Sequence, residues 1–128
     1  MILKLFFLQP NTNSVIPYVQ NGRLDACFDF DLASNIINSV KSGSSAGLQQ
    51  QILTIRESYP ALQYGTFLTN HDMDRVYNKL GYNNEKMKLA ASIYLTMPGI
   101  PFIYYSSNGC AANFVFFVLL LPIFPPKV

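Results

Sequence analysis

The fold is decided by residues 64–105, YGTFLTNHDMDRVYNKLGYNNEKMKLAASIYLTMPGIPFIYY. Two short segments rich in β-branched and aromatic residues, 64–69 and 102–105, flank an amphipathic stretch that opens at Asn83 or Asn84. A strand, a crossover helix and a second strand within about 40 residues form a βαβ unit of a parallel sheet. Both segments are apolar throughout, which is typical of parallel strands covered on both faces.

Two more helices are predicted upstream of this unit. In residues 31–43, DLASNIINSVKSG, apolar residues recur at helical spacing, Asp31 can cap the amino end and Gly43 can end the helix. A second helix is predicted over 46–59, because its apolar residues form one stripe and Pro60 follows. The order helix, helix, strand, helix, strand indicates an α/β fold.

The remaining segments give weaker patterns. Residues 9–22 contain Pro, Asn and Gly throughout and predict a loop, whereas CFDF at 27–30 predicts a short extended piece. The helix after Asn83 is predicted to present one broad apolar face to the core. The residues of this face are Leu89, Ala90, Ile93, Tyr94 and Met97.

The composition limits the classes of function. The 128 residues suit one domain, and half of them are hydrophobic. Only 12% are charged, and the net charge of +2 is scattered along the chain, so nucleic-acid binding has no support. The two cysteines, Cys27 and Cys110, lack metal-ligand spacing and are predicted to be free thiols, the first of them buried.

The apolar ends of the chain do not predict a leader or a membrane anchor. MILKLFFLQP at residues 1–10 has an apolar patch shorter than that of a secretory signal, with no small-residue cleavage site after it. FVFFVLLLPIF at residues 114–124 is shorter than the roughly 20 residues of a helical span, and prolines interrupt it. The sequence does not indicate a cellular compartment.

The candidate functional residues follow the strand predicted at 64–69. In α/β folds, ligands bind at the carboxyl ends of parallel strands, where Asn70, His71 and Asp72 are placed. A carboxylate accepts hydrogen bonds from hydroxyls and an imidazole can donate one, so these residue types suit sugar recognition. In the alternative interpretation, Asp72 caps the following turn and His71 is an ordinary loop residue. His71, Asp72 and Asp74 supply too few metal-ligand types, with no further motif, to predict a metal site.

These motifs resemble the α-amylase family of retaining glycoside hydrolases. In that family an F-x-x-N-H-D stretch ends the seventh strand of a TIM barrel, as in GTFLTNHDMDRV, and P-G-x-P-x-I-Y-Y lies on the eighth, as in PGIPFIYY. NSVIPYVQNGRLDACFDFDLASNIINSV resembles the segment between the fifth and sixth strands. The resemblance covers residues 13–105 and implies a partial TIM barrel with parallel strands and crossover helices.

The resemblance also implies roles for three residues. Asp72 would be the third catalytic-site carboxylate, which holds sugar hydroxyls and favours the distorted ring of the transition state. His71 would donate a hydrogen bond to the substrate, and Arg75 would contact sugar as well. The implied substrate is an α-glucan or a maltooligosaccharide, and no cofactor is expected. Calcium ligands known in complete family enzymes are not found in this sequence.

Residues 1–12 and the apolar tail 106–128 depart from the family pattern. The glutamate expected before NSVIPY is missing, because residues 1–12 contain no acidic residue. Asp25, in GRLDA, looks like the family nucleophile, but the only glutamate between it and Asp72 is Glu57, which lies in a helical pattern rather than at a strand end. DACFDFDLA also fits the later segment of the family better. The departures lead us to expect a truncated or frame-shifted form of a longer gene.

Three hypotheses therefore stay open. The first is a glycoside hydrolase of the α-amylase type with an incomplete catalytic domain, and the second is an inactive remnant or weak carbohydrate binder. The third is a small membrane-associated protein that uses the apolar tail. About 250 residues make a complete barrel, so a partial one should leave unpaired strand edges, and we expect self-association through them.

Overall fold

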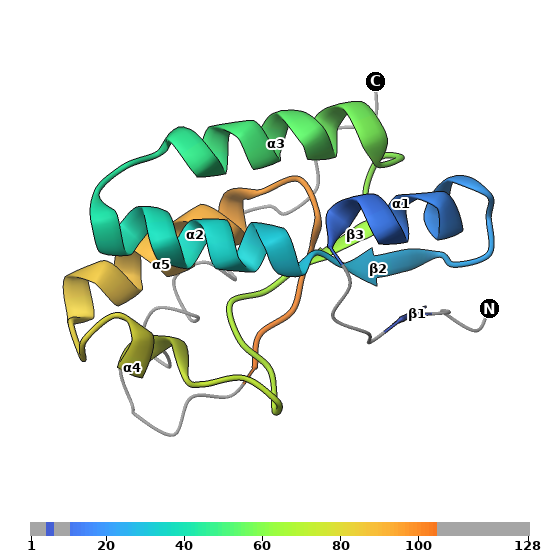
Figure 1. Cartoon of the computed structure of the whole chain (residues 1–128). Helices are drawn as coiled ribbons and strands as arrows, with labels where there is room; N and C mark the ends of the chain where they lie inside the picture. The colour runs from blue at the N-terminus through green and yellow to red at the C-terminus, as the bar shows by residue number, and fades with distance from the viewer. Residues whose placement is uncertain (1–4, 7–10, 105–128) are drawn as a thin grey trace.

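The computed structural model describes residues 5–6 and 11–104. Within these residues the chain alternates short strands with helices (Figure 1). The elements are β1 (Leu5–Phe6), α1 (Thr12–Gln20), β2 (Ala26–Phe28), α2 (Phe30–Ser42), α3 (Ala46–Ser58), β3 (Tyr64–Thr66), α4 (Val76–Lys79), α5 (Asn84–Thr96) and β4 (Ile100–Pro101).

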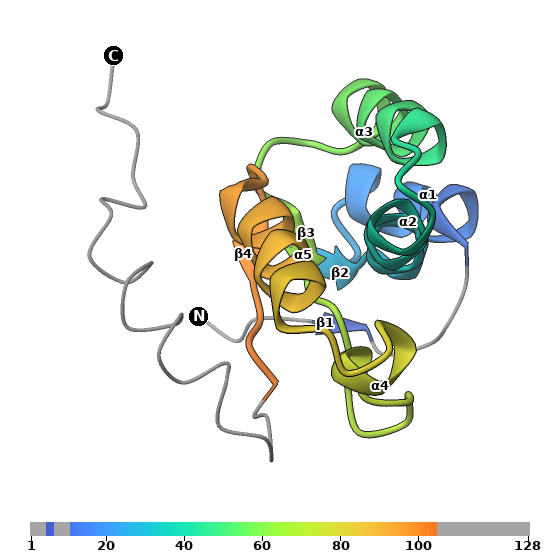
Figure 2. The same cartoon turned by 90° about the vertical axis from the view of Figure 1, so that its left-hand side faces the viewer.

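The strands form one parallel sheet in the order β1-β2-β3-β4, which is also their order along the chain. Helices connect each strand to the next, and α2 packs against both α3 and α5 (Figures 1 and 2). The prediction of an α/β fold with parallel strands and crossover helices is therefore confirmed. The carboxyl ends of parallel strands meet at one edge of the sheet, so residues that follow β2 and β3 can share a site.

Side chains that alternate between the two faces of the sheet form two separate apolar clusters. Cys27 and Tyr64 belong to the main core, which they form together with the buried faces of the helices. Phe28, the next residue after Cys27, belongs to a second cluster with Ala33 and Phe67. Neighbouring residues of a strand point to opposite faces, which places the helices over one face of the sheet and the aromatic cluster over the other.

The aromatic cluster requires a glycine in β3. The ring centroids of Phe28 and Phe102 lie 4.5 Å apart. A Cβ atom on Gly65 would lie 3.1 Å from atoms of both rings. Only a residue without a side chain lets the two rings approach the strand this closely. The backbone N–H of Phe102 donates to the carbonyl of Thr66 at 2.8 Å and extends the pairing beyond β4.

The prediction of a loop over residues 9–22 was wrong, because residues 12–20 form α1. The side chain of Asn11 caps this helix by accepting a hydrogen bond from the backbone N–H of Ser14. Its buried residues lie on one face, and their packing on the core outweighs the proline inside the helix. These buried residues are Thr12, Val15, Ile16 and Val19.

The helix predicted at 31–43 is confirmed as α2, with a correction at its cap. Asp29 rather than Asp31 caps the helix, and its carboxylate accepts from the backbone N–H of Leu32 at 2.7 Å. Asp31 lies in the first turn, where its negative charge interacts favourably with the helix dipole. Gly43 ends the helix with a φ of 75°, a left-handed conformation that glycine adopts without strain.

The other elements differ from the predictions mainly at their ends. The helix predicted over 46–59 is confirmed as α3. The strand predicted over 64–69 ends at Thr66, and the strand predicted at 102–105 is instead formed by residues 100–101. Tyr105, the last residue of the second predicted strand, lies outside the described residues.

Two further details of the carboxyl-side half were not predicted. The short helix α4 occupies residues 76–79, a stretch too short to show a helical period. Asn83 caps α5 as expected, but Leu89 is 53% exposed, and Ala91 is buried instead. Ala90, Ala91 and Tyr94 are buried, and Ile93 and Met97 of the predicted face pack against the core while partly buried.

Cys27 is a buried free thiol, as predicted, and donates to the hydroxyl of Tyr59 at 3.4 Å. Cys110 and the tail 106–128 lie outside the described residues. Of the described helices, none combines the length and the apolar character needed to cross a membrane.

Candidate functional site

The predicted residues lie in the loop that follows β3. Thr69 and Asn70 shape this loop: the Thr69 hydroxyl donates to the carbonyl of Asp74 at 3.0 Å, and the Asn70 side chain accepts from the backbone N–H of Asp72 at 3.0 Å. The second contact is an Asx turn, a local substitute for a backbone turn. The first residue of the Asn-His-Asp sequence is therefore a turn former that sets the direction of the other two.

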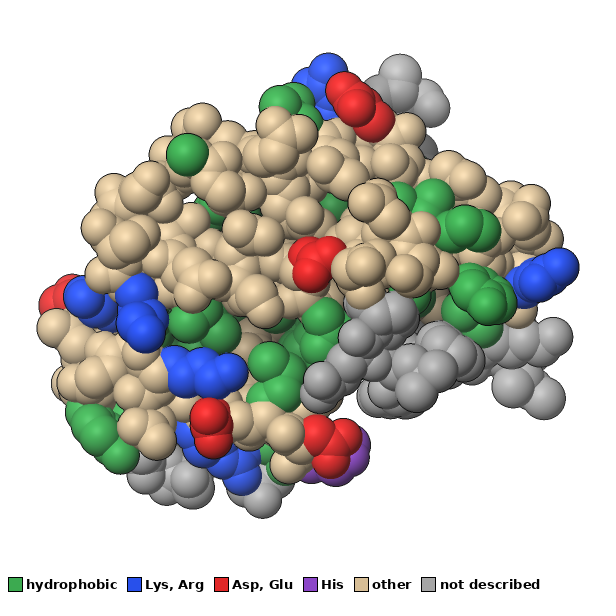
Figure 3. Space-filling view, in the orientation of Figure 1, with side chains coloured by type: hydrophobic (Ala, Val, Ile, Leu, Met, Phe, Trp, Pro, Cys, Tyr) green, Lys and Arg blue, Asp and Glu red, His purple; other side chains and the backbone are tan. Residues whose placement is uncertain are grey.

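His71 and Asp72 pair with each other at the surface. Nε2 of His71 lies 3.2 Å from Oδ2 of Asp72, and the two side chains are 66% and 64% exposed. Exposed pairs of this kind contribute little to stability, about 1 kcal/mol at most. Both side chains can thus contact a ligand without the loss of a structural interaction. Figure 3 shows the histidine at the edge of the molecule, next to an acidic side chain.

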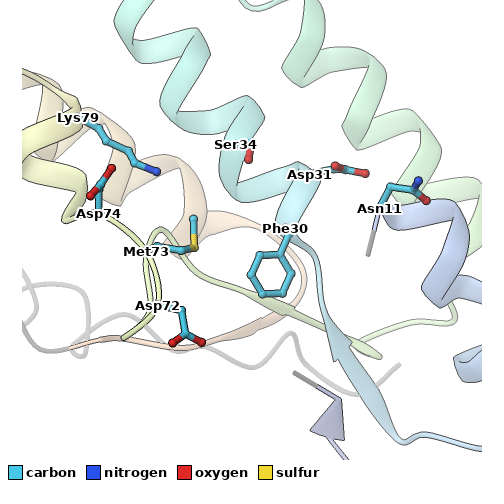
Figure 4. A pocket seen from close by; sticks show the side chains of 8 residues that line it. All are labelled: Asn11, Phe30, Asp31, Ser34, Asp72, Met73, Asp74 and Lys79. Atoms are coloured by element: carbon cyan, nitrogen blue, oxygen red, sulfur yellow. The ribbon is translucent and has the colours of Figure 1, made fainter. Parts of the chain in front are cut away.

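Asp72 lines a pocket of about 630 Å³. This volume falls within the range of about 300 to 1,000 Å³ that is typical of small-molecule sites. The walls come from the cap of α1, the first turns of α2, the loop after β3 and the end of α4. The lining residues are Asn11, Phe30, Asp31, Ser34, Asp72, Met73, Asp74 and Lys79 (Figure 4).

The pocket combines an apolar centre with charged walls. Phe30 lies between the two groups of polar residues in Figure 4, and its ring packs edge-on against Phe67 at 4.9 Å. Three carboxylates, those of Asp31, Asp72 and Asp74, face one ammonium group, that of Lys79. This surplus of negative charge disfavours anionic ligands and suits neutral ligands that are rich in hydroxyl donors.

A buried carboxylate lies just behind this pocket. Asp29 is 1% exposed and accepts hydrogen bonds from the Thr12 hydroxyl at 3.1 Å and from the Gln51 side chain at 3.1 Å, besides capping α2. Burial raises the pKa of Asp29, while the bonds from Leu32 and Thr12 oppose that shift. Because Asp29 joins α1, α2 and α3, it fixes the wall from which Phe30 and Asp31 project.

Comparison with known proteins identifies the family. The family model for the alpha amylase catalytic domain matches residues 7–115. The chain belongs to the α-amylase catalytic-domain family. It is 41% identical over 89 residues to an alpha-amylase 3 from Dictyoglomus thermophilum, and 33% identical over 100 residues to the alpha-amylase SusG from Bacteroides thetaiotaomicron. These matches cover 66% and 75% of this chain but only 18% and 14% of the two relatives.

A solved structure supports the same family. The α-amylase from H. orenii aligns with a TM-score of 0.68 and 36% identity, over 77% of this chain and 21% of that one. Together with the four consecutive parallel strands, this likeness confirms the predicted partial TIM barrel. The chain thus spans about a fifth of the length of these α-amylases.

The structure places the predicted α-amylase residues in three different settings. Asp72 lines the pocket, and His71 pairs with it at the rim. Arg75 is half-buried and is not among the residues that line the pocket. Its guanidinium lies 4.7 Å from the ring centroid of Tyr104. Asp25 is exposed just before β2, at the amino end of the sheet, which agrees with its rejection as nucleophile. The sugar contacts of His71 and Arg75 stay predictions.

Sequence reasoning missed the wall opposite Asp72. Phe30 and Asp31 follow β2 just as the Asn-His-Asp loop follows β3, so the rule of shared carboxyl ends could have found them. The interpretation of Asp31 as a cap concealed this. Within residues 5–6 and 11–104, no three His, Cys, Asp or Glu side chains gather as a group that could hold a metal ion.

Proposed function

We propose that this chain forms the carboxyl-side part of the catalytic barrel of a glycoside hydrolase that acts on α-glucosidic bonds of starch-like polymers or maltooligosaccharides. One observation carries the proposal: Asp72, which follows β3 in a family-type Asn-His-Asp sequence, lines a pocket at the carboxyl edge of the sheet. The three proteins named above are called α-amylases, which supports the substrate class.

In this proposal Asp72 binds the substrate sugar but does not by itself break the bond. A retaining glycosidase uses two carboxyl groups about 5 Å apart, one as nucleophile and one as acid and base. Asp72 would be the third carboxylate and would accept hydrogen bonds from hydroxyls of the ring that becomes distorted. His71, 3.2 Å from it, would orient this carboxylate and donate to the same sugar. Arg75 would contact the sugar from beyond the pocket.

A second function is favoured by the sequence that precedes α1. Residues 1–12 contain no acidic side chain at the place where the family carries its acid. A chain without the two reacting carboxyl groups would be an inactive remnant or a weak carbohydrate binder. Loss of members of a cooperating catalytic set removes most of the rate enhancement.

Cleavage of soluble starch and of maltoheptaose by the purified chain separates the two functions. An active hydrolase loses its activity in Asp72→Asn, whereas a binder releases no reducing ends in either form. Activity that Asp72→Asn retains in full would contradict the assigned role of Asp72. Because the proposal includes no cofactor, glucan binding should be the same with and without EDTA. A loss of binding in EDTA would point to a metal such as calcium.

Self-association is also part of the proposal. β1 and β4 are the outermost of the described strands, and each has only one described neighbour in the sheet. Exposed strand edges offer unpaired backbone groups to a second chain. Sedimentation velocity should therefore show dimers or larger species whose share rises with concentration. A monomer at every concentration would contradict this part.

A further inference from the structure

We propose that Asn21, which precedes Gly22 at the carboxyl end of α1, is a site of spontaneous deamidation that weakens the junction between α1 and β2. Asn-Gly occurs in the sequence at 21–22 and at 108–109, and only the first pair lies within the described residues. The modification is independent of the sugar chemistry proposed above, because it needs only the chain and water.

The reaction takes place between the side chain of Asn21 and the main chain of Gly22. The backbone nitrogen of Gly22 gives its proton to solvent base and bonds to Cγ of Asn21, while the side-chain nitrogen takes a proton from water and leaves as ammonia. Water then opens the resulting succinimide. Cleavage of the new bond between nitrogen and Cγ gives aspartate, and cleavage of the original main-chain bond gives isoaspartate. Each product replaces a neutral amide with a carboxylate.

Asn21 and Gly22 are accessible to this reaction. Both residues are exposed, and no hydrogen bond within residues 5–6 and 11–104 holds the side-chain amide of Asn21. Gly22 has no side chain that could hinder the attack of its nitrogen. The pair also lies at the end of a helix, since Asn21 is the residue that caps α1. Local opening is therefore easier here than in the middle of an element.

One backbone hydrogen bond slows the reaction in the folded chain. The N–H of Gly22 donates to the carbonyl of Val19 at 3.0 Å, so this bond must open before the nitrogen can attack Asn21. Helix ends fray readily, which allows this opening. We therefore expect slower deamidation in the folded chain than in an unfolded peptide. It should still be faster than at the other described asparagines, since none of them precedes a glycine.

The modification acts on the turn that leads from α1 into β2 (Figure 1). After Gly22, the backbone N–H groups of Arg23 and Leu24 both donate to the carbonyl of Tyr18, at 3.0 and 3.1 Å. Isoaspartate adds a methylene group to the main chain and displaces these donors. Aspartate leaves the main chain unchanged, but the helix dipole disfavours a carboxylate at the carboxyl end of a helix. Both products should therefore weaken the turn.

Mass spectrometry of the full 128-residue chain tests the site. The chain is kept in mildly alkaline buffer, and trypsin then releases residues 5–23 as one peptide. Asn21 should convert to aspartate and isoaspartate, whereas the other two asparagines of this peptide should stay intact. A synthetic peptide of residues 16–26 serves as the unfolded reference and should convert faster. If Asn21 stays unchanged in the chain while this peptide converts, the proposed site is wrong.

Gly22→Ala tests the attacking group. Alanine places a side chain beside the nitrogen, so the conversion of Asn21 should become much slower. The same change in the synthetic peptide keeps the test valid, because the φ of 65° at Gly22 strains an alanine in the folded chain. Conversion as fast as in wild type, in both the chain and the peptide, would refute the attack by the Gly22 nitrogen.

Two aspartate variants test the effect on stability. Asn21→Asp copies one product at the carboxyl end of α1, and Asn13→Asp makes the same change of charge in the first turn of that helix, where Asn13 is exposed. Asn21→Asp should lower the midpoint of urea unfolding more than Asn13→Asp does, because the helix dipole favours negative charge only at the amino end. An unchanged midpoint in Asn21→Asp, or equal losses in both variants, would contradict the weakening of the turn.

Discussion

Two aspartates that follow neighbouring strands have opposite environments. Asp29 comes directly after β2, is 1% exposed and accepts bonds from Leu32, Thr12 and Gln51. Asp72 follows β3 in a loop, its side chain is 64% exposed, and within residues 5–6 and 11–104 this side chain pairs with His71. The same edge of the sheet thus carries two different carboxylates. The oxygens of Asp29 are buried and hydrogen-bonded within the fold, whereas those of Asp72 are exposed to solvent.

The difference teaches which carboxylate can bind a ligand. Every hydrogen bond to Asp29 joins elements of the fold, so a ligand would have to break the packing of α1, α2 and α3 to reach it. Asp72 can exchange water for sugar hydroxyls with no change in the fold. Strong functional candidates are therefore those carboxylates whose position the fold fixes but whose oxygens stay accessible to a ligand.

The largest expected effect is on stability. Asp29→Ala should lower the free energy of unfolding by about 3 kcal/mol, because it removes a helix cap and the acceptor of the buried Thr12 hydroxyl. Asp72→Ala should change it by about 0.5 kcal/mol or less, as exposed substitutions usually do. Urea unfolding of the two variants measures both values. Equal losses of unfolding free energy in the two variants would contradict the distinction between a structural Asp29 and an exposed Asp72.

The second effect is on glucan binding, where the substitution of Asp72 should matter more than that of Asp29. Asp72→Asn should weaken maltose binding at least tenfold, which is about 1.4 kcal/mol. Its fold should be unaffected, since the Asp72 side chain is 64% exposed and its partner His71 is equally open to solvent. Calorimetric titration with maltose measures the loss, and thermal unfolding without sugar serves as the control. A variant that binds as wild type does but unfolds at a lower temperature would assign Asp72 a structural role.

The third effect is the pH dependence of stability. Burial raises the pKa of Asp29 in the folded chain, so folding is most favourable while this carboxyl is protonated. Its contribution is present below the unfolded value of about 4 and is lost as the pH rises through the raised folded value. The stability of wild type should therefore fall over this range relative to Asp29→Asn, and Asp72→Asn should follow wild type. Parallel urea-unfolding curves for wild type and Asp29→Asn would contradict the burial effect.

The smallest effect concerns the exposed pair. His71→Gln should change the free energy of unfolding by about 0.5 kcal/mol or less, because the 3.2 Å contact with Asp72 is open to solvent. Thermal unfolding at low and high salt measures this small difference. A loss of 2 kcal/mol or more in the free energy of unfolding would show that the His71–Asp72 pair stabilises the loop and is not available to a ligand.

The sequence predicted the elements with strong local signals. Ile36, Ile37 and Val40 recur at helical spacing before Gly43, so α2 could be placed from residues 31–43 alone. α1 could not, because Pro17 and the nearby asparagines indicate a loop, and only packing against the core makes the helix favourable. The propensity of a short segment is a weak signal, which tertiary contacts can reverse.

Only part of the candidate site could be predicted, because local sequence patterns do not show which segments the fold brings together. Asp72 stands out because apolar residues end abruptly before it. Phe30 and Asp31 lie about forty positions earlier, and no local pattern shows that the fold brings them to the same pocket as Asp72. Lys79 was also missed, since α4 is too short and polar to reveal which side it presents.

The central claim is that Asp72 contacts a sugar in the pocket beside Phe30. A crystal structure of this chain, or of a longer gene product that contains it, with bound maltose tests this claim most directly. We predict a glucosyl hydroxyl about 2.7 Å from the Asp72 carboxylate, a usual length for such a hydrogen bond. Maltose bound elsewhere, with Asp72 surrounded by solvent alone, would contradict the account.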